Sequence, residues 1–223
     1  MVPIRHIVRN GLADGIVFSG TRPNDPRVAF LNEAGFPFVS HGRTDSTLPH
    51  PWCDYDNAAF ARLTVARLVA KGRRRLLLIP PQPVRTYARH MTDGFLAATR
   101  EAGVEGIIDP ALTLSAKTQS LQDGALRLVA ERGIDGFICP GEVAAMAVLA
   151  GLQDGQVRLG RDVDVVAKQT SGTFDLYRPR VDTVYEDIRA AGEALGHLLL
   201  RRIAGEDPAG LTILLAPTAS FRG

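Results

Sequence analysis

The sequence predicts an α/β protein with two similar lobes, each a mostly parallel sheet flanked by helices, and a ligand cleft between them. Strand-like apolar runs alternate with helix-like segments along the whole chain, which is the pattern of βα units. One phrase also occurs twice, at residues 12–20 and 133–141: an Asp-Gly turn, a short apolar run and a closing glycine. We interpret each copy as a buried parallel strand. Because ligands bind beyond the carboxyl ends of such strands, the duplication indicates two lobes facing one cleft.

Two kinds of local signal locate the elements. Apolar residues spaced three and four apart predict helices, and glycine or proline marks where these helices stop. Uninterrupted apolar runs between them predict buried strands. The predicted helices are 26–34, 59–70, 87–102, 121–132, 143–150 and 188–203. The predicted strands are 15–18, 36–40, 76–79, 136–139, 163–166 and 211–215.

Single residues fix several boundaries. Asp25 begins the first predicted helix, and Asp54 or Asp56, in a strand-to-helix turn at 54–57, can cap the second. The proline-rich stretch 80–83 separates a buried strand from the helix that follows it. No low-complexity segment or long linker interrupts the series, so the whole chain belongs to the two lobes.

Composition bounds the class of protein. A chain of 223 residues with 45% hydrophobic content suffices for one large domain or two lobes. The 26 basic and 24 acidic residues are interspersed, and the basic run 73–75 lies where cations complement a helix dipole. The two cysteines lack metal-ligand spacing, and the chain has neither a signal-peptide pattern nor a membrane-length apolar stretch. We therefore expect a cytoplasmic protein without a membrane partner.

Catalytic signatures are scarce. The sequence has no Gly-x-Ser-x-Gly elbow, no phosphate-binding loop and no cluster of metal ligands. We expect no catalytic residue, no metal and no cofactor. The alternative is an enzyme of the doubly wound type that uses His90, Glu142 or Glu186 as acid or base.

Polar residues follow two of the predicted strands. In the turn 54–57, carboxylates and an amide can bind sugar hydroxyls, although helix capping also accounts for one of the acids. Lys168 and Gln169 come directly after the strand at 163–166, where two donors are difficult to reconcile with a core position. We expect both groups to face the cleft.

Segments in a fixed order resemble the ligand-binding core of LacI/GalR-type transcriptional repressors, which have the type I periplasmic-binding-protein-like fold. They are Ala13-Asp14-Gly15-Ile16-Val17, Asp56-Asn57, Gly94-Phe95-Leu96-Ala97-Ala98, Gly136-Phe137-Ile138-Cys139, Leu159-Gly160-Arg161-Asp162-Val163-Asp164-Val165-Val166 and Pro179-Arg180-Val181-Asp182-Thr183-Val184. No single segment is specific, but their order and spacing extend over nearly the whole chain.

The resemblance implies a first lobe of residues 1–71 and 187–205 and a second of 72–186 and 206–223, joined by three crossovers. It implies that a small-molecule effector, a carbohydrate, sugar acid or phosphosugar, closes the lobes and shifts the balance between two dimer arrangements. On the first lobe it places Asp56, Asn57 and Phe60 near the effector. On the second lobe it places Tyr87, Arg89, His90, Gln119, Glu142, Lys168, Gln169 and Glu186 there.

Three positions depart from the family pattern. Met91 replaces a common arginine, for which Arg89 can substitute; Gly141-Glu142 replaces Asn-Asp; and Ala167-Lys168-Gln169 replaces Gly-Phe-Asp. Because the last change removes an acid and adds a base, an acidic ligand becomes an alternative to a neutral sugar.

The family's N-terminal helix-turn-helix, and the strand, helix and strand that follow it, have no counterpart in this sequence. We therefore expect a fragment or a truncated reading frame, which forms a homodimer and which cannot bind operator DNA by itself. The alternative function is that of a periplasmic sugar-binding protein of a transporter. The absent leader and the repressor-like tail at 217–222 argue against it.

Overall fold

The computed structural model describes residues 1–221, and the chain forms two compact units. The first unit contains residues 1–56, 84–87 and 187–216, and the rest of the chain forms the second unit. The predicted second lobe ends at 222–223, which lie outside the described residues. Within the described part of the chain, no helix combines the length and the apolar character needed to cross a membrane.

A four-stranded parallel sheet forms the centre of the first unit, in the order β1-β2-β3-β9. Its strands are β1 (Ile16–Ser19), β2 (Phe38–His41), β3 (Trp52–Tyr55) and β9 (Thr212–Leu215). Its helices are α1 (Val2–Asn10), α2 (Pro26–Glu33) and α7 (Ile188–Ile203). Strand alternation divides the core, because Phe38 packs with Val28 and Leu31 of α2 whereas Val39 packs with Leu195 of α7.

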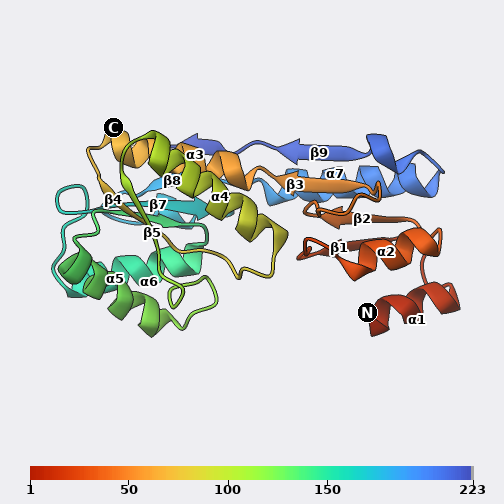
Figure 1. The fold of residues 1–223 in the computed structure, drawn as a ribbon, viewed down its shortest axis with the longest axis horizontal. Helices are drawn as coiled ribbons and strands as arrows, with labels where there is room; N and C mark the ends of the chain where they lie inside the picture. Colours follow the sequence, from red (N-terminus) through yellow and green to blue (C-terminus); the bar gives the residue numbers. More distant parts are fainter. Residues whose placement is uncertain (222–223) are drawn as a thin grey trace. The chain divides into compact units, whose positions relative to one another are not determined.

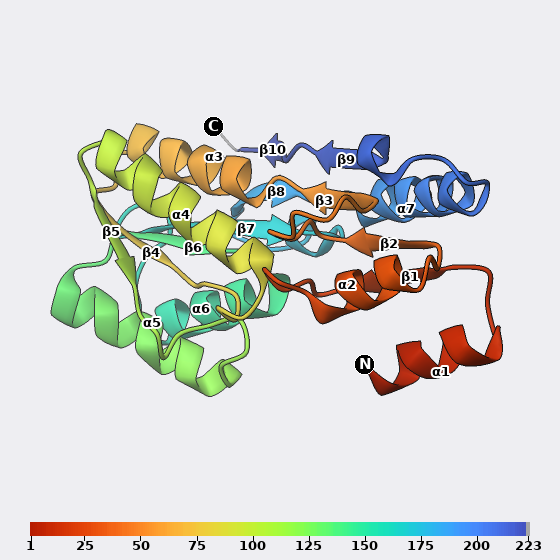
Figure 2. The same cartoon turned by 45° about the vertical axis from the view of Figure 1, so that its right-hand side comes forward.

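The second unit has a six-stranded sheet in the order β10-β8-β7-β6-β4-β5, parallel except for β10. Its strands are β4 (Arg75–Leu78), β5 (Glu105–Ile108), β6 (Gly136–Cys139), β7 (Asp164–Gln169), β8 (Asp182–Tyr185) and β10 (Thr218–Ser220). Helices α3 (Asn57–Ala70) and α4 (Thr86–Glu101) cover one face, and α5 (Thr118–Arg132) and α6 (Glu142–Asp154) cover the other, as Figures 1 and 2 show. A short 3-10 turn occupies Thr173–Asp175 in this unit, and another occupies Pro208–Gly210 in the first unit.

Close packing of α5 on α6 depends on one glycine. A Cβ atom on Gly151 would lie 2.4 Å from the backbone oxygen of Gln122, so only glycine allows this approach of the two helices. Beneath α6, Val148 joins Phe137 of β6 and Val165 of β7 in a buried apolar cluster. This cluster fixes the sheet and the two helices as one body.

The repeated phrase forms a parallel strand in both units, but only the second copy is fully buried. All four residues of β6 are buried. By contrast, β1 is an edge strand, and Val17 is 48% exposed. The prediction of two buried strands was therefore wrong for β1, because an edge strand has a neighbour on one side only.

The contacts divide the chain differently from the predicted lobes at two secondary-structure elements and at residues 84–87, which belong to the first unit rather than the second. Helix α3, predicted for the first lobe, packs on β6 and β7 of the second unit. Residues 206–216, predicted for the second lobe, belong to the first unit because β9 pairs with β3. In each case the apolar face of the element, rather than its place in the sequence, decides its unit.

Ion pairs attach the carboxyl-terminal half of α3 to the sheet. Arg67 Nε lies 2.6 Å from Asp182 Oδ2, Arg73 Nε lies 2.6 Å from Asp164 Oδ2, and Lys71 contacts both carboxylates. Both aspartates are buried, so their charges need these partners. Part of the basic run that follows α3 is thus used inside the second unit.

Candidate functional site

Polar side chains meet at the carboxyl ends of β6, β7 and β8 in the second unit. Lys168 and Gln169 end β7, Glu142 begins the helix after β6, and Glu186 directly follows β8. The backbone N–H of Glu186 donates to the carbonyl of Gln169 at 3.0 Å, which brings the ends of β7 and β8 together. Parallel β-sheets bind their ligands at this edge.

Lys168 and Glu186 form an ion pair. Lys168 Nζ lies 2.5 Å from Glu186 Oε2, and the two side chains are only 12% and 14% exposed. The ammonium group also lies 5.9 Å from the ring centroid of Phe60, which is a cation–π distance. The positive charge of Lys168 is therefore balanced within the unit.

Gln169 carries an unused acceptor. Its Nε2 donates to Thr183 Oγ1 at 3.2 Å, and the residue is 6% exposed. Within residues 1–221, Gln169 Oε1 is buried and accepts no hydrogen bond. A buried acceptor without a donor costs about 1–3 kcal/mol, so a hydroxyl or amine that reached this oxygen would gain that amount.

Glu142 holds the loop that follows β7. Its Oε1 accepts from Thr170 N at 2.8 Å, from Ser171 N at 2.9 Å and from Ser171 Oγ at 2.9 Å. Burial raises the pKa of Glu142, but these hydrogen bonds lower it by more, so the net pKa lies below the ordinary value. Glu142 thus positions the residues next to Gln169.

The other predicted site residues lie on three elements. Asn57 and Phe60 belong to the first turn of α3, both buried, and therefore to the second unit rather than the first. Arg89 and His90 lie near the start of α4, and Gln119 near the start of α5, where its Nε2 donates to Asp123 Oδ1 at 2.9 Å.

Asp56 and Tyr87 belong to the first unit, which is a correction for Tyr87, expected on the second lobe. The second unit therefore places Lys168 and Glu186 beside Phe60 on the α3 face of β7, and Gln169 with Thr183 on the opposite face, which α5 and α6 cover. Thr183, the partner of Gln169, was not predicted as a site residue, because a threonine inside a strand gives no signal of its own. Three arginines around the end of β1, which line a small cavity of the first unit, were not predicted either.

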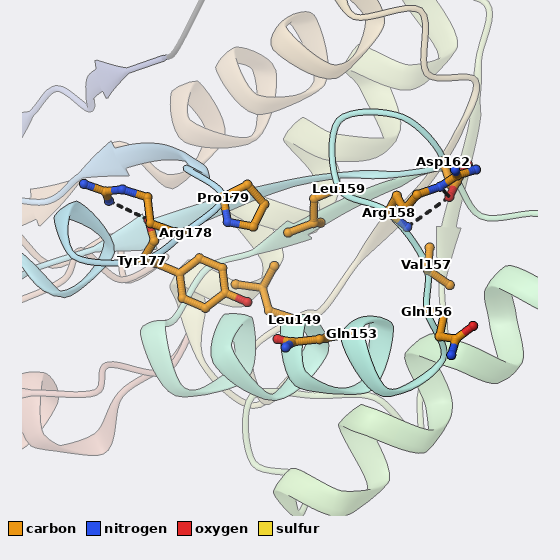
Figure 3. A pocket seen from close by; sticks show the side chains of 10 residues that line it. All are labelled: Leu149, Gln153, Gln156, Val157, Arg158, Leu159, Asp162, Tyr177, Arg178 and Pro179. Carbon is orange, nitrogen blue, oxygen red and sulfur yellow. Dashed lines mark hydrogen bonds and ion pairs between the residues drawn. The ribbon is translucent and has the colours of Figure 1, made fainter.

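A separate cavity of about 810 Å³ lies in the second unit. Figure 3 shows its lining side chains, which come from the end of α6, the segment before β7 and the segment before β8. They are Leu149, Gln153, Gln156, Val157, Arg158, Leu159, Asp162, Tyr177, Arg178 and Pro179. Since these segments precede their strands, the cavity is at the opposite edge of the sheet from Lys168 and Gln169. In residues 1–221, no group of three or more acidic, histidine or cysteine side chains could hold a metal ion.

Comparisons with known proteins agree with this architecture. A family model described as a periplasmic binding protein-like domain matches residues 65–223. The HTH-type transcriptional regulator RafR of Escherichia coli is 31% identical over 113 residues, which are 51% of this chain and 33% of RafR. The chain spans 33% to 60% of the length of the curated relatives that it matches.

Solved structures show the same likeness. A regulatory protein of the LacI family from Chloroflexus aggregans superposes with a TM-score of 0.87 at 26% identity, covering 99% of this chain and 80% of that one. The complex of the regulator CelR with cellobiose superposes with a TM-score of 0.81 at 24% identity, covering 98% and 69%. At 24% identity, the likeness to CelR shows that the two chains share a fold.

Two α/β units with mostly parallel sheets, and polar groups at the carboxyl ends of strands, are the architecture of a periplasmic binding protein-like domain. The chain belongs to the periplasmic binding protein-like domain family, in the form of the effector-binding domain of LacI-family regulators.

Proposed function

We propose that this chain senses a sugar or sugar derivative for a cytoplasmic transcriptional regulator. Binding of the effector at the ends of β7 and β8 would change the affinity of the intact regulator for operator DNA, which a helix-turn-helix contacts. The regulatory role rests on the relatives, which are HTH-type transcriptional regulators.

The observation that carries the sugar proposal is the buried, unpartnered oxygen of Gln169 at the carboxyl end of β7. A sugar hydroxyl both donates and accepts, so one hydroxyl can satisfy Gln169 Oε1 and another can bond to the Lys168–Glu186 pair on the other face of the sheet. The ring of Phe60 adds an apolar surface suited to the C–H face of a sugar. An effector with several hydroxyl groups would have to lie over the carboxyl ends of β7 and β8 to reach groups from both faces of the sheet. The cellobiose complex of CelR supports this proposal at the level of the fold.

The position of the site suggests how binding is transmitted. Asn57 begins the first segment of the second unit, and Glu186 ends its long segment 88–186. Both residues are therefore adjacent in sequence to the first unit. A ligand that binds them more tightly in one arrangement of the chain than in another shifts the population toward that arrangement.

A thermal-shift screen of sugars, followed by calorimetry on the best binder, tests the proposal. Gln169→Ala should weaken binding by roughly 10-fold, because it removes a buried hydrogen-bonding group. Gln153→Ala is the matched control, since Gln153 lines the cavity at the opposite edge of the sheet. If neither Gln169→Ala nor Lys168→Ala weakens a confirmed ligand, these residues do not form the effector site.

We also propose that the regulator is a homodimer and that the cavity of Figure 3 belongs to its interface. The lining is half apolar and half polar, and the apolar side chains, together with the adjacent Leu176, which is 85% exposed, support this. Light scattering after size exclusion should show a dimer for the native chain and a monomer for Tyr177→Asp. A native monomer, or a dimer that survives Tyr177→Asp, would exclude this interface.

A further inference from the structure

Two arginines converge on one carbonyl at the end of β1 in the first unit. Arg27 Nη2 donates to the carbonyl oxygen of Gly20 at 3.1 Å, and Arg85 Nη1 donates to the same oxygen. Gly20 has φ +64°, and a Cβ atom there would lie 2.6 Å from Arg85 Nη1. The positive φ favours glycine at this position, and its missing Cβ leaves room for the end of the Arg85 side chain.

The charge of Arg27 is compensated, whereas that of its neighbours is not. Asp25 accepts from Arg27 Nε at 2.8 Å and from Arg27 Nη2 at 2.6 Å, and it is buried. Burial raises the pKa of Asp25, but its bonds to Arg27 and to the backbone of Arg22 lower it by more, so the carboxylate stays charged. Among residues 1–221, the guanidinium groups of Arg22 and Arg85 meet no carboxylate.

The two uncompensated guanidinium groups share one cavity. Its volume is about 230 Å³, and Gly20, Arg22, Asp25, Arg27 and Arg85 contribute to its lining. Helix α2 begins at Pro26, so the positive end of its dipole adds to the same field. The three arginines and one aspartate that line this cavity therefore carry a net charge of two positive units.

The residue after Arg85 carries a buried hydroxyl, although it does not line the cavity. Thr86 follows Arg85, is 1% exposed, and its N–H donates to the carbonyl of Thr21 at 3.1 Å. Within the described part of the chain, Thr86 Oγ1 has no hydrogen-bond partner. The cavity itself offers the guanidinium groups of Arg22 and Arg85, which are donors that bind oxyanions in proteins.

We propose that Arg22 and Arg85 form an oxyanion subsite, which takes the phosphate or carboxylate group of a small ligand. The subsite consists of residues of the first unit, whereas Gln169 belongs to the second unit. The identity of its biological ligand rests on the proposed function, under which that ligand is a sugar phosphate or a sugar acid.

The proposed subsite uses Arg22 and Arg85, rather than the lysine that the sequence suggested, to bind an acidic ligand. Lys168 was the expected partner of an acid, but Glu186 already balances it. Arg22 has no side-chain role in the described fold, and Arg85 bonds only to a carbonyl. Their charges remain available to a ligand.

Inorganic phosphate is the first probe, used with the native chain at constant ionic strength against chloride. Phosphate should raise Tm and bind with a measurable Kd. Arg22→Gln and Arg85→Gln should each weaken it by at least about 10-fold, and Arg85→Lys by less. Arg189→Gln is the matched control, because the Arg189 side chain is 89% exposed on α7. Equal phosphate binding in all variants, or none in the native chain, would overturn the subsite.

A second arm separates the possible ligands. Hexose 6-phosphates and hexuronates are each compared with the neutral hexose. Tighter binding of one of them that depends on Arg22 supports the subsite and shows whether it takes a phosphate or a carboxylate group. If neutral hexoses bind through Gln169 and the hexose 6-phosphates and hexuronates bind no more tightly, the subsite is excluded and the proposed function is supported. If phosphate binding requires Arg22 while no sugar or sugar derivative binds, the subsite is supported and the proposed function is excluded.

Discussion

The ammonium group of Lys168 lies 2.5 Å from the carboxylate of Glu186, with both side chains largely buried. The sequence alone suggested that the lysine would neutralise an acidic ligand. The ion pair removes that role, because a lysine already matched by a carboxylate adds no net charge for a ligand to compensate. It leaves instead a rigid pair of polar groups at the ends of two strands.

Breaking this pair should destabilise the second unit. Lys168→Met leaves Glu186 mostly buried without its partner, which should lower the free energy of unfolding by about 1–3 kcal/mol. Urea denaturation of the native chain and the variant measures this difference in the free energy of unfolding. The double variant Lys168→Met with Glu186→Gln should recover part of the loss, since no charge is then left uncompensated. Additive effects of the two changes would contradict a coupled pair.

Removing the Glu142 carboxylate should loosen the loop after β7. Glu142→Ala deletes the acceptor for two backbone N–H groups and one hydroxyl, at a cost of about 1–2 kcal/mol. Hydrogen exchange at Thr170 and Ser171 should accelerate. Glu101→Ala, at the end of α4, is the control and should leave these amides unchanged.

The same carboxylate predicts a pH dependence. Because the folded pKa of Glu142 is lowered, its contribution to stability is complete above its ordinary pKa of 4.5 and is lost as the pH falls through the folded value. The acid side of the stability curve should therefore be shallower in Glu142→Ala. An unchanged curve would show that the hydrogen bonds do not stabilise the charged form.

Two glycines in helices should respond in opposite ways to alanine. Gly151→Ala places a methyl group 2.4 Å from a backbone oxygen of α5 and should cost about 1–3 kcal/mol. Gly192→Ala in α7 meets nothing within 4 Å and should stabilise by up to about 1 kcal/mol. Thermal unfolding compares them. Equal effects would mean that α5 and α6 are not packed as closely as described.

His50 should make the first unit sensitive to mild acid. Burial lowers the pKa of His50, more than the carbonyl of Leu48 and the charge of Asp25 raise it. The neutral ring stacks on Phe38, with ring centroids 6.1 Å apart. Its contribution to stability is therefore present above pH 6.5 and is lost as the pH falls through the lowered folded value.

The variant His50→Phe keeps the stacked ring and cannot be protonated, so its stability should vary less between pH 5 and 7 than that of the native chain. His197→Phe is the control, because His197 is exposed on α7. Chemical denaturation at a series of pH values measures the difference. Parallel curves for the native chain and His50→Phe would exclude His50 as the sensitive group.

The sequence by itself determined the fold class and most helices. The helices α2 to α7 form where the periodic apolar residues predicted them, and β6 lies where the repeated phrase placed it. These elements follow from local signals, namely apolar spacing, caps and glycine stops, which need no partner elsewhere in the chain. The family followed from the order of segments that such signals produce.

Only the tertiary structure decided where charged residues belong. Strands β3 and β8 were not predicted, because each contains a buried aspartate. In a sequence, an aspartate in a short segment is typical of a turn rather than of a strand. Arg43 lies 3.1 Å from Asp54 of β3, and Arg67 lies 2.6 Å from Asp182 of β8, so each charge is paired. Such partners are not neighbours in the sequence, and neither are Lys168 and Glu186. The spacing of apolar residues predicts which side chains are buried, whereas the partner that neutralises a buried charge depends on the three-dimensional fold.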